Sequence, residues 1–188
     1  MKNSTLRTLA VSAILSVSAL AGTTAFAENP MVGGQAMYED KDIIDNAVNS
    51  ADHTTLVAAV KAAGLVDTLK GPGPFTVLAP VNDAFAALPA GTVDNLLKPE
   101  NKEQLVQVLT CHVIPAKALA ADVSKMVADG GGQAVVDTVG GCKLTAKADG
   151  GKVTFTDENG NVATVTIADV IQSNGVIHVI DKVLLPKS

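Results

Sequence analysis

Aromatic side chains are scarce in this sequence: its 188 residues include no tryptophan, one tyrosine and four phenylalanines. Binding sites that stack nucleobases or sugar rings need exposed aromatic rings. The few scattered phenylalanines are better explained as members of a hydrophobic core. The composition therefore argues against an aromatic platform for sugars or single-stranded nucleic acids.

Positive charge is also limited. Lys and Arg together number 14 against 19 Asp and Glu, and the formal net charge is −5. Nucleic acids and anionic lipid surfaces are both bound through clustered Lys and Arg side chains. We therefore expect no nucleic-acid partner and no electrostatic attachment to anionic lipid.

Only one long hydrophobic run is present, from Leu9 to Leu20. Lys2 and Arg7 precede it, and Ala25-Phe26-Ala27 supplies the small residues that a signal peptidase recognises. We predict a signal peptide over residues 1–27, cleaved after Ala27, and a secreted or periplasmic protein without membrane insertion after cleavage. The alternative is an uncleaved anchor, although the run is shorter than the ~20 residues that a membrane-spanning helix needs.

Cysteine is nearly absent, and the two cysteines are Cys111 and Cys142. An exported chain enters an oxidising compartment, where such a pair commonly forms a disulfide. This bridge would stabilise the fold by about 3–4 kcal/mol through its closed loop. The alternative is two buried free thiols. Cys111-His112 with Cys142 lacks the paired close spacings of zinc ligands, so we expect no metal site.

The rest of the chain changes its periodicity near the middle. Apolar residues recur at helical spacing over Leu56 to Ala63 and Pro99 to Leu109, whereas from Gln133 onward they alternate as in strands, for example over 152–156 and 164–167. Residues 176–180 are predicted to form a strand that is buried on both faces. Segregated helices and strands predict an α+β fold. Residues 28–40 have no periodicity and are interpreted as a flexible lead-in to one domain over residues 41–186.

Three segments resemble motifs of the fasciclin domain family: Thr76 to Phe85 (TVLAPVNDAF), Leu109 to Pro115 (LTCHVIP) and Asn174 to Asp181 (NGVIHVID). The resemblance extends over nearly all of 41–186 and suggests a bacterial, secreted, single-domain member. It implies a twisted β-wedge or sandwich of about seven strands with a flanking helical layer. It also implies a non-enzymatic cell-adhesion module whose partner is a protein, a cell surface or an extracellular matrix.

Most residues of the two outer motifs are expected to have structural roles. Pro80 would end a buried strand, Asn82 or Asp83 would cap the next helix, and Gly175 would provide positive φ in a turn. His178 lies inside an apolar strand, where it is either a hydrogen-bonded core residue or a ligand. The motif residues to be located in the structure are Thr76, Pro80, Asn82, Asp83, Phe85, Asn174, Gly175 and His178.

Candidate adhesion residues follow from the same resemblance. Animal members carry a Tyr-His pair in the central strand that is linked to integrin contact, and here the pair is Cys111-His112, with cysteine in place of tyrosine. Asp169, followed by Val170 and Ile171, resembles an aspartate that contacts integrins in some members. An exposed aspartate can complete the coordination of an integrin metal ion. The alternative is that Asp169 caps a turn or lies at a solvated strand end.

Two other classes of function remain open. A periplasmic small-ligand or metal-binding protein would use His53, His112 or His178, but they are dozens of residues apart. Residues 157–160 (DENG) have the acidic appearance of a calcium loop without its full ligand spacing, and a hairpin turn is the alternative. A hydrolase would need a Gly-x-Ser-x-Gly motif or a Ser–His pair, and we expect neither. We therefore predict no enzyme activity and no cofactor.

Overall fold

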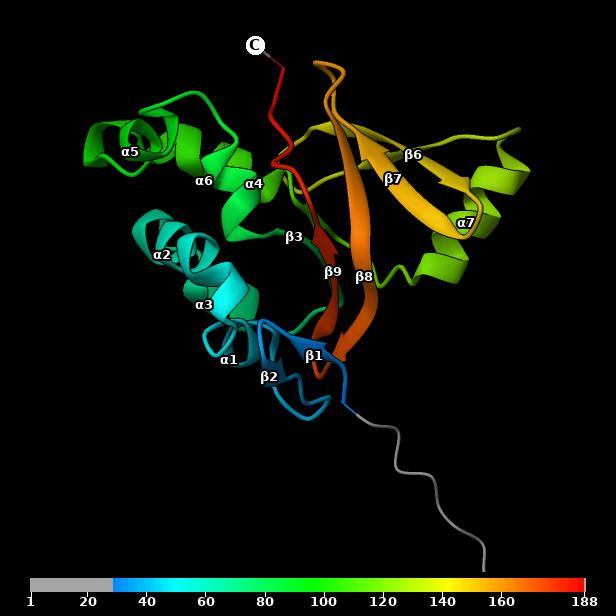
Figure 1. The fold of residues 1–188 in the computed structure, drawn as a ribbon, viewed down its shortest axis with the longest axis horizontal. Helices are drawn as coiled ribbons and strands as arrows, with labels where there is room; N and C mark the ends of the chain where they lie inside the picture. Colours follow the sequence, from blue (N-terminus) through cyan, green and yellow to red (C-terminus); the bar gives the residue numbers. More distant parts are fainter. Residues whose placement is uncertain (1–28, 188) are drawn as a thin grey trace, which may run out of the picture.

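The structure, a computed structural model, describes residues 29–187, so the signal peptide predicted over 1–27 lies outside the described residues. Helices dominate the first half of the described chain and strands the second half (Figure 1). The elements are β1 (Met31–Val32), β2 (Gln35–Ala36), α1 (Ile43–Ala47), η1 (Ala51–His53), α2 (Thr54–Ala63), α3 (Val66–Lys70), β3 (Phe75–Pro80), α4 (Asn82–Ala86), α5 (Thr92–Leu96), η2 (Pro99–Asn101), α6 (Lys102–Thr110), β4 (Val113–Ile114), α7 (Ala120–Asp129), β5 (Ala134–Asp137), β6 (Lys143–Asp149), β7 (Lys152–Thr156), β8 (Val162–Gln172) and β9 (Gly175–Ile180). This arrangement confirms the predicted α+β class.

Seven strands form one mixed sheet in the order β4-β3-β9-β8-β7-β6-β5. β3 and β9 run parallel, with Phe75 opposite Gly175 and Pro80 opposite Ile180, and the other neighbouring strands are antiparallel. The two outer motifs of the sequence therefore lie side by side in the middle of the fold, although about a hundred residues separate them.

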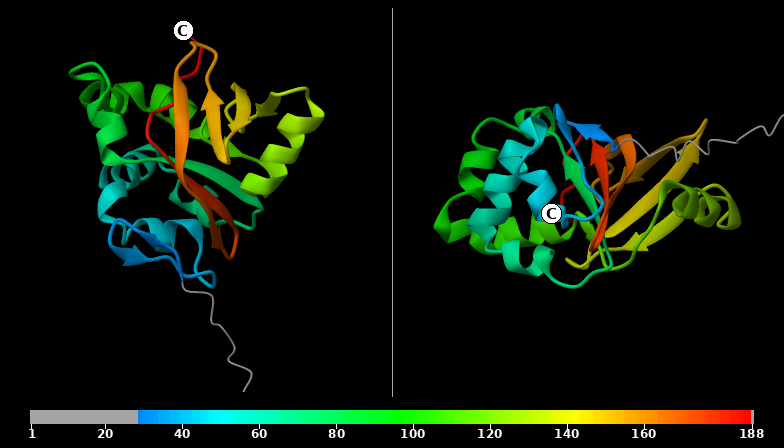
Figure 2. Two further views of the ribbon diagram at one scale, coloured as in Figure 1. Left: turned by 45° about the vertical axis from the view of Figure 1, so that its right-hand side comes forward. Right: turned by 90° about the horizontal axis from the view of Figure 1, so that it is seen from below.

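The long strand β8 joins the two halves of the sheet. Its first residues pair with β7, and the segment from Val165 to Gln172 pairs with β9, with irregular register on either side of Ile167. Such bulges bend a strand and increase its twist. The sheet consequently folds over along β8 into the predicted wedge, with β3 and β9 on one side and β5 to β7 on the other (Figure 2).

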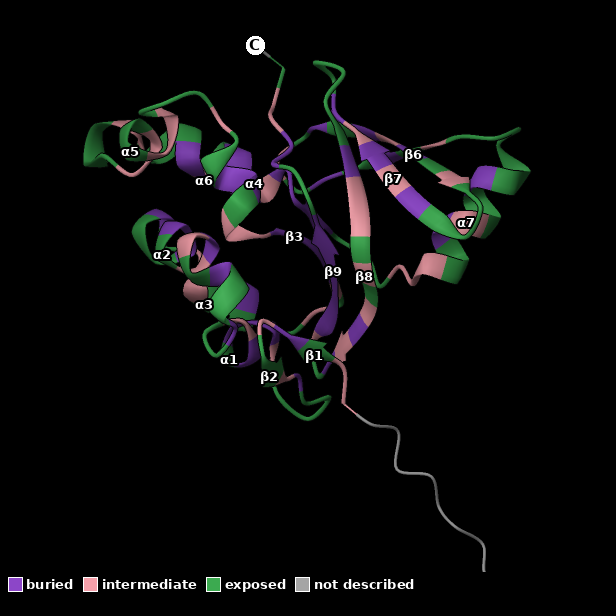
Figure 3. Cartoon of the chain, in the orientation of Figure 1, coloured by how far each residue is buried: buried purple, intermediate pink, exposed green. Residues whose placement is uncertain are grey.

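Two hydrophobic cores lie on opposite faces of β3 and β9. Successive side chains of a strand point to opposite faces, so Val77 packs with the helices α1, α2 and α6, while Leu78 packs inside the wedge with Phe155 and with Val123 of α7. Both central strands are buried along almost their whole length (Figure 3). This confirms the prediction that residues 176–180 form a strand buried on both faces.

The first described segment, residues 29–40, differs from the prediction. Residues 29–40 were expected to be a flexible lead-in, but they contain the hairpin β1–β2, which packs on the helical core. Val32 and Met37 are 4% and 1% exposed. The sequence pattern missed this because only two apolar side chains anchor the hairpin, and they are too few to show a periodicity.

Candidate functional site

Asp169 joins β8 to the first turn of α7. It is in the left-handed region, with φ of 57°, which Asp tolerates better than most residues. Its Oδ1 accepts a hydrogen bond of 2.7 Å from the Ala120 N–H at the start of α7. The carboxylate thus satisfies one of the N–H groups that a helix start leaves unpaired. This geometry matches the capping alternative for Asp169.

His178 of β9 lies next to Asp169 and is almost fully buried. Its Nδ1 accepts a hydrogen bond from the Asp169 N–H at 3.2 Å, so the ring proton belongs on Nε2, which donates to the Ala118 carbonyl at 2.8 Å. Burial lowers the pKa of His178 and favours the neutral ring. His178 therefore connects β9, β8 and the segment before α7 as a hydrogen-bonded core residue.

The remaining predicted adhesion residues are poorly accessible. Val170 and His112 are 0% and 2% exposed, and Ile171 is half-buried within β8. The structure brings Asp169, Val170 and Ile171 together in one bulged strand. His112 is not part of this strand and lies between α6 and β4.

His112 links α6 to the end of the chain. Its Nδ1 donates to the Val108 carbonyl at 2.8 Å, and its Nε2 accepts from the Leu184 N–H at 2.9 Å. Burial lowers the pKa of His112 to about 4. A charged ring would lose the acceptor that holds Leu184, so the neutral form is the one that fits this position.

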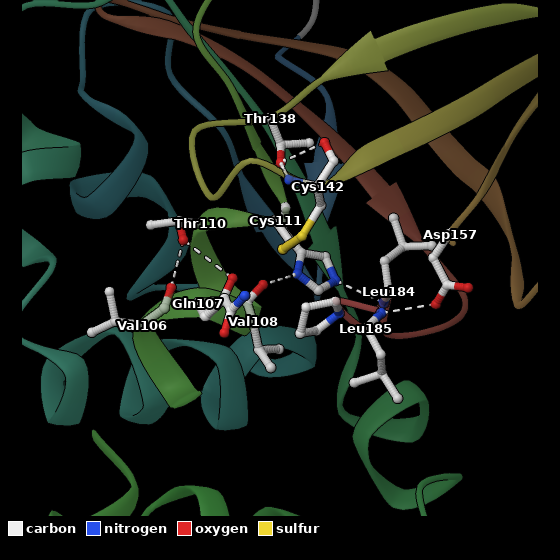
Figure 4. Close-up of a disulfide and its surroundings, with 12 residues drawn as sticks. Val106, Gln107, Val108, Thr110, Cys111, Thr138, Cys142, Asp157, Leu184 and Leu185 are labelled. Carbon is white, nitrogen blue, oxygen red and sulfur yellow. Dashed lines mark hydrogen bonds between the residues drawn. A yellow bond between two sulfur atoms is a disulfide. The ribbon is translucent and has the colours of Figure 1, made fainter. Parts of the chain in front are cut away.

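The disulfide joins Cys111, the residue before His112 in the chain, to Cys142, which lies next to Thr138 (Figure 4). Cys111 and Cys142 are bonded, with their Cα atoms 5.3 Å apart, a separation common for disulfides. The end strands β4 and β5 approach each other here, and the Val139 N–H donates to the Val113 carbonyl at 2.8 Å. The bridge thus fastens the two ends of the sheet, closing it almost into a barrel.

Asp157 is buried in the turn between β7 and β8. Its Oδ1 accepts from the N–H groups of Asn159 and Asn161, and its Oδ2 accepts from the Leu185 N–H at 2.9 Å and from the Asn161 side chain. Both oxygens are therefore engaged within the chain, as the hairpin alternative implies. Within residues 29–187, no group of three His, Cys, Asp or Glu side chains is placed to hold a metal ion.

The first motif connects β3 to the segment before α7 and to α4. Thr76 Oγ1 donates to the Ala116 carbonyl and accepts from the Ala118 N–H. Pro80 is the last residue of β3, and Phe85 is buried in the helical core, as expected. Asp83 is exposed in the first turn of α4.

Asn82 has a role that the sequence did not predict. It was expected to cap its own helix, α4, but Val81 occupies that capping position. Asn82 Oδ1 instead accepts from the Thr55 N–H at 3.0 Å in the first turn of α2, and Nδ2 donates to the Ala51 carbonyl at 2.8 Å. The error arose because a cap can come from a residue that is distant in sequence.

The second motif begins with Asn174 and Gly175. Asn174 accepts from the Ile43 N–H at the start of α1 and donates to the carbonyls of Leu69 and Gly71 at the end of α3. Gly175 does not have the positive φ that was predicted. Glycine is needed because a Cβ there would lie 2.1 Å from the Phe75 carbonyl oxygen of the neighbouring strand.

One Ser–His pair is present, contrary to expectation. Ser50 Oγ lies 2.8 Å from His53 Nδ1, and His53 Nε2 faces the Ala79 carbonyl at 3.4 Å. Both residues are 3% exposed, and Gly33 of the hairpin lies directly over Ser50. The pair is enclosed and its imidazole is oriented by a backbone carbonyl, so it links η1 to β3. In the sequence, this pair could have been suspected from the three-residue spacing between Ser50 and His53.

The three motif segments all lie within the part of the chain that matches a known protein family. The profile of the family described as Fasciclin domain matches residues 51–186. The chain is 54% identical over 144 residues to protein sll1483 of Synechocystis sp., which covers 77% of this chain and 73% of that protein. It is 42% identical to protein sll1735 of the same organism, over 77% of this chain and 97% of that protein.

A solved structure has the same fold. It is the FAS1 domain pair from the insect cell adhesion molecule fasciclin I, with a TM-score of 0.68 and 18% sequence identity. The match covers 77% of this chain and 51% of that chain, which is about half of the domain pair. Among the residues placed in the structure, no helix is long and apolar enough to cross a membrane.

Proposed function

Because the chain belongs to the fasciclin domain family, we propose that it is a non-enzymatic adhesion module that contacts a protein, a cell surface or an extracellular matrix. The solved structure with the same fold comes from a cell adhesion molecule. Four polar residues of the two motifs form side-chain hydrogen bonds inside the chain, which supports a structural role for the motifs: Thr76, Asn82, Asn174 and His178. A partner would then be contacted through exposed surfaces.

The outer face of β5 to β8 is the surface that carries this proposal. One row of side chains crosses four strands, with Val135 opposite Thr145, Thr145 opposite Thr156 and Thr156 opposite Val162. Val135 and Val162 are 57% and 42% exposed. The residues that alternate with this row along β5 to β8 point to the other face of the sheet and fill the wedge core. This row offers methyl and hydroxyl groups on a partly exposed face of the sheet, a suitable surface for a protein or polymer partner.

His112 and Val170 are not assigned a direct contact in this proposal. Both are enclosed, and a partner could reach them only after the strands had separated. Asp169 and the half-buried Ile171 belong to β8, the last strand of this face, and are assigned to the edge of the contact surface.

A binding experiment tests the proposal. Protein without residues 1–27 would be titrated onto immobilised cells, matrix protein and surface polysaccharide. We expect saturable binding to one of them, weakened at least about tenfold in a Val135→Asp/Val162→Asp variant, because a carboxylate would be desolvated in the interface. Val48→Asp is the matched control, since Val48 is 45% exposed on α1, outside this sheet. Absence of saturable binding to all three would refute the proposal.

Export is proposed as the second part of this function. It is supported by the basic start, the apolar run and the Ala25-Phe26-Ala27 cleavage pattern of the sequence. N-terminal sequencing of the protein collected from the periplasm and the medium should begin at Glu28. Recovery of the protein in the cytoplasm with residues 1–27 intact would contradict export.

A further inference from the structure

An apolar cavity lies under the helices α1, α2 and α3, against the face of β3 that carries Val77. Its volume is about 40 Å³, above the roughly 10–15 Å³ that a cavity needs to hold one water molecule. Fifteen of its 17 lining residues are aliphatic, and the other two are His112 and Lys61. The cavity reaches the surface where exposed Lys61 and half-buried Ala47 and Val57 form its rim.

The polar groups of the lining restrict what the cavity can bind. Both ring nitrogens of His112 already have partners in the backbone of Val108 and Leu184. No side-chain hydrogen-bonding group deep in the cavity is therefore left for a ligand. Sugars, nucleotides and metal ions are excluded, because each would lose water without regaining its polar contacts. Apolar cavities of this kind remain dry and accept apolar guests.

The rim adds one charge to this apolar interior. Lys61 is exposed on α2, and within the described part of the chain it has no ion-pair partner. Lys61 is exposed although it lines the cavity, so its aliphatic stem can cover the apolar edge while its ammonium group stays in solvent. The site therefore combines a dry apolar interior with a cation at the mouth.

We propose that this cavity is a binding site for a free fatty acid, with the end of the alkyl chain inside the cavity and the carboxylate near Lys61. The cavity would hold the terminal carbons, and the remaining methylenes would lie along the half-buried Val57, Leu65 and Val66, which also line it. The site is separate from the outer face of β5 to β8 and does not depend on the adhesion proposal.

The site is tested directly by titrating the protein with monomeric decanoate. The melting temperature and the methyl NMR shifts of the protein are monitored during the titration. We expect a saturable rise in melting temperature and shifts at Ile44, Val57 and Val60 but not at Val153 in the wedge core. Lys61→Met should weaken decanoate about two- to fivefold, the range for an exposed ion pair, and leave decan-1-ol unchanged. Lys147→Met is the matched control and should have no effect.

A mouth-blocking variant provides an independent check. Ala47→Phe places a ring at the rim and should abolish the saturable decanoate response. Ala58→Phe makes the same change on the exposed side of α2 and should preserve it. Absence of a decanoate response in the unmodified protein would overturn the proposal. So would shifts confined to residues outside the lining, or binding only to phosphatidylglycerol vesicles with no response to monomeric decanoate.

Discussion

At the residue scale, the sequence predicted several roles but not the partners that fulfil them. His178 and Asp169 each matched one of the two alternatives considered, because an apolar strand and a turn-like setting favour a core histidine and a capping aspartate. Their partners Ala118 and Ala120 are 60 and 49 residues away. The partner of Asn82 was missed for the same reason. Local patterns identify the kind of polar residue, whereas tertiary packing determines what it bonds.

Buried histidines should make the fold sensitive to acid. His112 stays neutral in the folded protein down to a pKa of about 4, whereas in the unfolded chain it takes up a proton below 6.5. Between these pH values the unfolded state binds more protons, so the free energy of unfolding falls as the pH falls. Urea denaturation at pH 7.5 and pH 4 should show a loss of about 3 kcal/mol from His112, increased by His53 and His178, whose pKa values are also lowered.

His112→Gln separates this effect from general acid sensitivity. The variant should be less stable than the natural chain at pH 7.5, because the bonds to Val108 and Leu184 are impaired. Its further loss between pH 7.5 and pH 4 should be smaller, because the titrating ring has been removed. Equal losses in both proteins would show that His112 does not cause the pH dependence.

At the element scale, long periodic segments were predicted well and weakly patterned ones were not. The strand over residues 152–156 and the helix from Leu56 to Ala63 match β7 and α2 closely. β8 was predicted only as the short stretch around Thr164 to Ile167, because its bulges interrupt the alternation of apolar and polar residues. The hairpin β1–β2 was missed altogether, and its stability depends on two buried side chains rather than on a pattern.

Met31 in β1 and Met37 directly after β2 provide a matched test of whether this hairpin is ordered. Met37 is 1% exposed and Met31 is 56% exposed. Met37→Ala should lower the free energy of unfolding by about 2–5 kcal/mol through the cavity that it leaves, while Met31→Ala should change it by less than about 0.5 kcal/mol. Urea denaturation measures both. If the two variants were equally mild, residues 29–40 would be the flexible lead-in that the sequence indicated.

At the scale of the whole molecule, the segregation of helices and strands was enough to predict the fold class. The wedge itself came from the family resemblance, since periodicity does not reveal that β3 pairs with β9 or that β8 is shared between the two cores. The closure of the sheet depends on the disulfide as well as on hydrogen bonds such as that between Val139 and Val113.

Removing the bridge should therefore weaken the whole fold rather than one loop. The cysteines are 31 residues apart, and the Cys111→Ala/Cys142→Ala variant should lose about 3–4 kcal/mol of unfolding free energy. The natural chain should show the same loss when a reductant is added during urea denaturation. The double variant should not respond to the reductant, and a response there would assign the effect to something other than the bridge.

The central position of β9 has a mechanical consequence for the adhesion role that we propose. β1 lies at the opposite end of the molecule from the C-terminal residues (Figure 1), and β9 is flanked along its length by β3 and β8. Tension applied at the C-terminal end along β9 would shear both hydrogen-bond ladders at once instead of opening them bond by bond. Single-molecule pulling from the two ends should therefore give a higher rupture force than pulling β5 away from β6.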